Sequence, residues 1–203
     1  MNKIILIAVI AVVVLIAIVV AVPLILRHGV SSGGYITPSD AANVIGGTWS
    51  IEEGQSFYFT VNSNNAVTIK YFNGTTETQP LSAFMKSSDM LSSSFVPTSG
   101  MVESLEGTVD NENSSIGALC LTFSSPTAAK DFFSNMQAEA MFFATQTQNV
   151  SSNVFVFYGP GGNFEREYLS GIVELSGDTV YIVVVVAPMP LGSATLENLV
   201  SYI

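Results

Sequence analysis

The sequence predicts an α+β protein: a single N-terminal transmembrane helix, then one domain with a mostly antiparallel β-sheet and two or three helices. Three observations predict this fold class. An unbroken apolar run lies near the N-terminus, alternating apolar segments separated by turn signals fill most of the remainder, and a few segments carry helix-start signals and helical periodicity. The length of 203 residues suits one ordinary domain with an appendage.

The apolar run covers residues 4–26 and contains no charged or polar side chain. As a helix it would extend roughly 34 Å, which exceeds the bilayer core of about 30 Å. A cleaved signal peptide fits less well, because its apolar region is shorter and a small-x-small site should follow it. A pilin-type precursor would need a small residue directly after Lys3. We therefore expect residues 1–3 to precede an uncleaved anchor that contacts membrane lipid, with a Gly/Ser tether at 27–36 and a domain at 37–203.

Charge and residue counts exclude several function classes. Six Lys and Arg against sixteen Asp and Glu give a net charge of −10, which is unsuited to binding nucleic acid. One cysteine, Cys120, excludes an intramolecular disulfide, a Cys-rich zinc site and an iron–sulfur cluster. The one histidine, His28, lies in the tether, so most imidazole chemistry is excluded. We expect no cofactor, no metal site and no catalytic residue.

The composition after the apolar run predicts that the domain is external and that the protein is a single-pass protein of the cell membrane. All sixteen acids lie there, and few bases do, so the domain would avoid strong positive self-repulsion in acid. Asn73, Asn113 and Asn149 each begin an Asn-x-Ser/Thr motif in a predicted turn or loop. These three are the expected glycosylation sites.

The first half of the domain predicts a short helix followed by an antiparallel meander. The helix has Thr37 as its N-cap and Pro38 in its first turn, and it ends at Gly46. The sequence Asn73-Gly74 predicts a tight hairpin turn. A Ser-rich surface loop at 87–99 follows. The expected strands are 48–52, 55–61, 66–72 and 75–79.

The second half predicts a longer helix and a buried central strand. The helix at 125–145 has apolar residues on one face, and a last helix is expected at 193–203. Residues 182–186 are all apolar, without alternation, so the strand at 179–187 should be covered on both faces. The other expected strands are 101–109, 116–123, 154–158 and 164–175, with a polar turn at 110–115 and a glycine-rich hairpin loop at 159–162.

Carboxylates are the remaining groups that could carry chemistry. Glu165 and Glu167 should share one strand face, and another group of acids surrounds one predicted hairpin. We expect both groups to form solvated surfaces. The hairpin group comprises Glu103, Glu106, Asp110 and Glu112.

These features favour a non-enzymatic function: a membrane-anchored extracytoplasmic binding or interaction module with a protein or glycan partner, such as an accessory subunit of a cell-surface assembly. Two alternatives stay open, an acid-tolerant external hydrolase that uses paired carboxylates and a surface-filament subunit. Two neighbouring, partly buried carboxylates with raised pKa values in a cleft would favour the hydrolase. A flat apolar patch with acids only at its rim would favour the binding module.

Overall fold

The computed structural model describes residues 35–87, 95–161 and 167–203. The predicted anchor at 4–26 and most of the tether lie outside these ranges. Within them, no helix has the length and apolarity needed to cross a bilayer.

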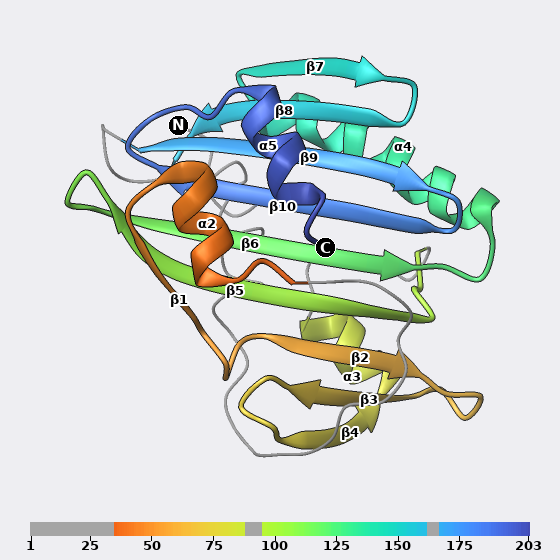
Figure 1. The fold of residues 1–203 in the computed structure, drawn as a ribbon. Helices are drawn as coiled ribbons and strands as arrows, with labels where there is room; N and C mark the ends of the chain where they lie inside the picture. Colours follow the sequence, from red (N-terminus) through yellow and green to blue (C-terminus); the bar gives the residue numbers. More distant parts are fainter. Residues whose placement is uncertain (1–34, 88–94, 162–166) are drawn as a thin grey trace.

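One antiparallel sheet of ten strands organises the domain (Figure 1). The order is β4-β3-β2-β5-β6-β10-β9-β8-β7, and β1 pairs with the part of β5 that β2 leaves free. The strands are β1 (Thr48–Ile51), β2 (Phe57–Val61), β3 (Ala66–Tyr71), β4 (Thr76–Pro80), β5 (Ser99–Val109), β6 (Glu112–Thr122), β7 (Gln146–Ser151), β8 (Val154–Pro160), β9 (Tyr168–Ser176) and β10 (Thr179–Ala187).

Helices cover both faces of the sheet. α2 (Pro38–Ile45) and α5 (Ser193–Val200) lie on one face, and α3 (Leu81–Ser87) and α4 (Pro126–Phe143) lie on the other (Figure 1). Each face carries its own apolar core, one built around α4 with Phe84 of α3 and one around α2 and α5. The predicted α+β class with one large antiparallel sheet is confirmed.

The apolar strand at 179–187 is an inner strand, as its lack of alternation predicts. β10 pairs with β6 on one side and β9 on the other. Ile182 and Val184 enter the core on the α4 face, while Val183 and Val185 enter the core on the α2/α5 face. Both faces therefore need apolar side chains from this strand, which explains the continuous run.

The helix starts follow the predicted capping chemistry. Thr37 and Asp40 form a capping box around Pro38, and α2 ends at Gly46 with φ of 91°. The Ser125 hydroxyl accepts a hydrogen bond from the Ala128 N–H at the start of α4. The sequence alone was sufficient for these boundaries because capping is a local interaction.

Several predicted boundaries are wrong. The polar turn at 110–115 is only two residues long, because Asp110 and Asn111 both have positive φ and β6 begins at Glu112. β1 and β2 do not pair with each other; both lie along β5. α3 and β7 were not expected. All residues of β7 are exposed and all but Val150 are polar, so it offers no apolar alternation to detect.

Candidate functional site

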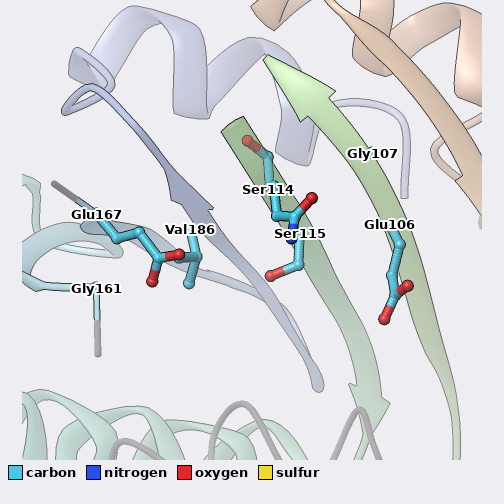
Figure 2. A pocket seen from close by; sticks show the side chains of 8 residues that line it. Glu106, Gly107, Ser114, Ser115, Gly161, Glu167 and Val186 are labelled. Atoms are coloured by element: carbon cyan, nitrogen blue, oxygen red, sulfur yellow. The ribbon is translucent and has the colours of Figure 1, made fainter. Parts of the chain in front are cut away.

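A polar groove lies where the β5–β6 hairpin approaches the start of β9 (Figure 2). The strand register aligns Glu106 with Ser115 and Ser115 with Val186, so three neighbouring strands contribute one row. The groove has a volume of about 320 Å³. We call it the acidic groove; its lining residues are Glu106, Gly107, Asn113, Ser114, Ser115, Gly161, Glu167 and Val186.

The end of the β8–β9 hairpin fixes the backbone beside Glu167. The Gly161 N–H donates a hydrogen bond to the Glu167 carbonyl at 2.8 Å. A Cβ atom on Gly161 would lie 2.5 Å from the Glu167 Cβ, so this close approach requires glycine. β8 and β9 do pair as a hairpin, but the predicted loop at 159–162 is misplaced, because Gly159 and Pro160 belong to β8; residues 162–166 lie outside the described ranges. Glu165 lies outside the described residues.

Two carboxylates enter the groove from opposite sides. Glu106 is exposed on β5, and Glu167 is half-buried directly before β9. Burial raises the pKa of Glu167, and the nearby charge of Glu112 raises it further. With the Asn113 amide and the serine hydroxyls, the described lining can accept hydrogen bonds from a ligand and attract positive charge.

The two groove carboxylates come from parts of the sheet that are not adjacent. β6 and β10 lie between β5 and β9, so the two backbones are three strand spacings apart, roughly 14 Å. A glycosidase pair is defined by its carboxyl groups, which lie about 5–9.5 Å apart, and not by the spacing of the backbones. Figure 2 shows Glu106 and Glu167 on opposite sides of Ser115.

Glu103 does not belong to the solvated group in which the sequence placed it. It is 0% exposed, on the α2/α5 face of β5. Its Oε2 accepts a hydrogen bond from the Ile36 N–H at 2.9 Å, while its Oε1 has no hydrogen-bond partner among the described residues. Burial raises its pKa to about 8; the Ile36 hydrogen bond opposes this shift and the Asp40 charge adds to it.

A sequence signal for the burial of Glu103 did exist. Met101, Leu105 and Val109 are buried on the same face of β5, so strict alternation assigns Glu103 to that face as well. The remaining members of the hairpin group, Glu106, Asp110 and Glu112, are exposed as predicted.

The other singled-out groups show no catalytic arrangement. Cys120 is half-buried, and burial raises its pKa to about 11, so the thiol stays protonated. No cluster of three or more metal-ligating side chains occurs within the described ranges. His28 lies outside them.

The three glycosylation motifs fall on different elements. Asn73 lies in the turn between β3 and β4, as predicted. The loop placement is wrong for Asn113, on β6 at the acidic groove, and for Asn149, on the edge strand β7. All three asparagines are exposed. Their glycosylation stays a prediction.

Comparisons with known proteins give a fold and no family. No family model and no curated protein matches the sequence. The structure is similar to the extracellular domain of PknH from Mycobacterium tuberculosis, with a TM-score of 0.54 and 11% identity, over 83% of this chain and 89% of that chain. At this identity the similarity shows a shared α+β architecture with one large antiparallel sheet and few helices.

Proposed function

We propose that this protein is a membrane-anchored extracytoplasmic binding module. The observation that carries the proposal is the fold similarity to the extracellular domain of PknH, which extends over most of both chains. The apolar run at residues 4–26 supports the anchor, and the excess of acids over bases in the rest of the chain supports an external location.

The acidic groove is the proposed binding site, and its chemistry suits a protein partner that presents lysine or arginine side chains. Glu106 and Glu167 supply negative charge from two sides, and Asn113 and Ser115 supply polar groups between them. Ammonium and guanidinium groups are hydrogen-bond donors without an acceptor, so they complement this lining. The depth of Glu167 matters because a partly desolvated charge pair is stronger than one at the open surface.

Fractionation and protease treatment of intact cells test the location. We expect the full chain to remain with membranes after carbonate washing, and we expect added protease to degrade residues 37–203 without lysis. Protection of the domain until the cells are lysed would reverse the orientation. A mature N-terminus beyond about residue 21 would show that the apolar run is a cleaved signal.

Zero-length carbodiimide cross-linking tests the groove, because this reagent joins a carboxylate to an amine only when they touch. We expect the full chain in its native membranes to be cross-linked to a lysine-bearing protein, and the double variant Glu106→Gln/Glu167→Gln to lose this product. Glu53→Gln is the matched control, since Glu53 is exposed in the turn between β1 and β2. An unchanged product in the double variant would exclude the groove.

A further inference from the structure

The two edges of the sheet are protected to different degrees. β4, at one end, carries Glu77 and Pro80 and leads directly into α3. A charge and a proline both discourage the addition of another strand. β7, at the other end, has β8 as its strand neighbour within the described residues. It contains neither a charged residue nor a proline, and all six of its residues are exposed.

Unburied apolar side chains lie next to the β7 edge. Met141 and Phe142, in the last turn of α4, are 69% and 82% exposed. The adjacent Phe143 points inward and packs edge-to-face on Phe157 of β8. The helix is therefore apolar on both its inner and outer sides at the end that leads into β7.

α4 is also joined to β7 by a side-chain hydrogen bond. The Gln137 Nε2 donates to the Asn149 Oδ1 at 2.6 Å. The uncovered turn of α4 and the free edge strand therefore form one surface, which we call the β7 edge: residues 141, 142 and 146–151. A partner that added a strand to β7 would reach α4 at the same time.

Charge favours self-association at the β7 edge over most other surfaces of this protein. Two copies with a net charge of −10 repel each other wherever acidic surfaces meet. The β7 edge has no charged side chain. Two copies that meet there therefore bring no like charges of the β7 edge itself together.

We propose that the β7 edge binds the β7 edge of a second copy of this chain, so that the two sheets join into one. Antiparallel pairing of a strand with its own copy requires a two-fold axis perpendicular to the sheet. That axis places both α4 helices on the same face of the joined sheet. Met141 and Phe142 of each copy then lie on the face where the partner's α4 also lies.

The position of Tyr35 and Ile36, where the first described range begins, supports a second copy as the occupant, a step that rests on the proposed membrane anchor. Tyr35 packs edge-to-face on Phe72, with 5.5 Å between ring centroids, and the Ile36 N–H binds Glu103. Phe72 and Glu103 belong to the α2/α5 side of the sheet. The two-fold axis therefore puts Tyr35 and Ile36 of both copies on one face. This arrangement suits two anchors in one membrane, and anchoring would raise the effective concentration of the two copies.

The difference between the two edges also predicts a closed dimer rather than a filament. A filament needs two complementary surfaces that repeat without closing, whereas pairing of one surface with itself stops at two copies. Pro80 and Glu77 make β4 a poor second surface. The proposal thus replaces the filament alternative with a dimer.

Disulfide trapping of the full chain in its native membranes tests the pairing. The single variants Thr147→Cys and Gln148→Cys each place one thiol in the middle of β7. Antiparallel self-pairing brings equivalent residues of the two copies together there. Thr78→Cys is the matched control, because Thr78 is equally exposed in the middle of β4. After mild oxidation we expect about tenfold more dimer from a β7 variant than from the β4 variant or from the parent with Cys120 alone.

A second substitution separates specific pairing from random collision. Adding Phe142→Glu to the β7 cysteine variant should reduce the trapped dimer several-fold, since it places like charges at the joined face. Equal trapping at β7 and β4, or trapping that Phe142→Glu leaves unchanged, would overturn the proposal. A trapped product with a different protein would also overturn it. These outcomes are independent of the carbodiimide result, which reports on the acidic groove.

Discussion

Glu103 and Glu106 lie three residues apart on β5, and the structure gives them opposite environments. Glu103 is completely buried on the α2/α5 face, whereas Glu106 is exposed in the acidic groove on the other face. Strand alternation accounts for the change of face. The coverage of each face accounts for the difference in burial.

The helices cover the two faces differently. On the groove side, α4 packs on β7 to β10 and α3 packs on β3 and β4. The groove lies on β5 and β6, at the hairpin end of the face. On the opposite side, Ile36 and the start of α2 lie over Glu103. A carboxylate on β5 thus lines an open groove on one face and is buried beneath α2 on the other.

The largest expected effect on stability comes from a charge placed on the part of the sheet that α4 covers. Val184 is 3% exposed and aligns with Gly117 of β6 and Gly171 of β9. We expect Val184→Asp to cost several kcal/mol at neutral pH, because an unpaired charge is buried, and domains are stable by only about 5–15 kcal/mol.

Thermal unfolding of the full chain in detergent measures this effect. Low pH should partly rescue Val184→Asp, since a neutral carboxyl is cheaper to bury. Val184→Ala is the matched control, which removes packing without adding charge. Parental stability of Val184→Asp at neutral pH would contradict both the closed face and the inner position of β10.

The second effect is a dependence of folding stability on pH, which Glu103 introduces. Its folded pKa of about 8 lies above the ordinary value of 4.5. The folded state therefore holds a proton that the unfolded state releases. This contribution to stability is complete below about pH 4.5 and is lost as pH rises to about 8, at about 1.4 kcal/mol per pH unit within that window.

Glu103→Gln should remove that dependence. The amide is neutral at every pH, so the variant should match the parent in acid and exceed its stability by several kcal/mol near pH 8. Urea unfolding between pH 4 and 9 measures the difference. A parent and variant whose stabilities stay parallel across this range would show that Glu103 does not take up a proton on folding.

The third effect is smaller and concerns a buried hydroxyl next to Glu103. Ser104 is 0% exposed, and its Oγ has no hydrogen-bond partner in the part of the chain that the structure describes. Its backbone is already held, because the Ser104 N–H donates to the Ser56 Oγ at 3.0 Å. We expect Ser104→Ala to be neutral or stabilising by up to about 1 kcal/mol. A loss of more than that in urea unfolding would reveal a hydrogen bond to the hydroxyl.

Sequence reasoning succeeds where the signal lies within one segment, and it fails where the structure depends on which distant segments become neighbours. The caps at Thr37 and Ser125 and the apolar run of β10 are local, and they are correct. The strand β7 and the acidic groove depend on which distant segments meet. Ser115 and Glu167 line the same groove only because β10 and β9 follow β6 in the sheet. No single segment of the sequence encodes that strand order.

The smallest effect on stability is expected for Glu106→Gln, and it completes the comparison with Glu103. The side chain is exposed, so the substitution should change the free energy of unfolding by no more than about 0.5 kcal/mol. The small effect should hold at pH 5 and at pH 8, whereas Glu103→Gln should diverge from the parent at the higher pH. Parallel urea titrations of both variants measure this contrast. A pH-dependent gain for Glu106→Gln would mean that its carboxylate is buried as well, and the groove would then be closed. A stable Glu106→Gln protein that has lost its cross-linked partner would assign Glu106 to recognition, because folding would be intact.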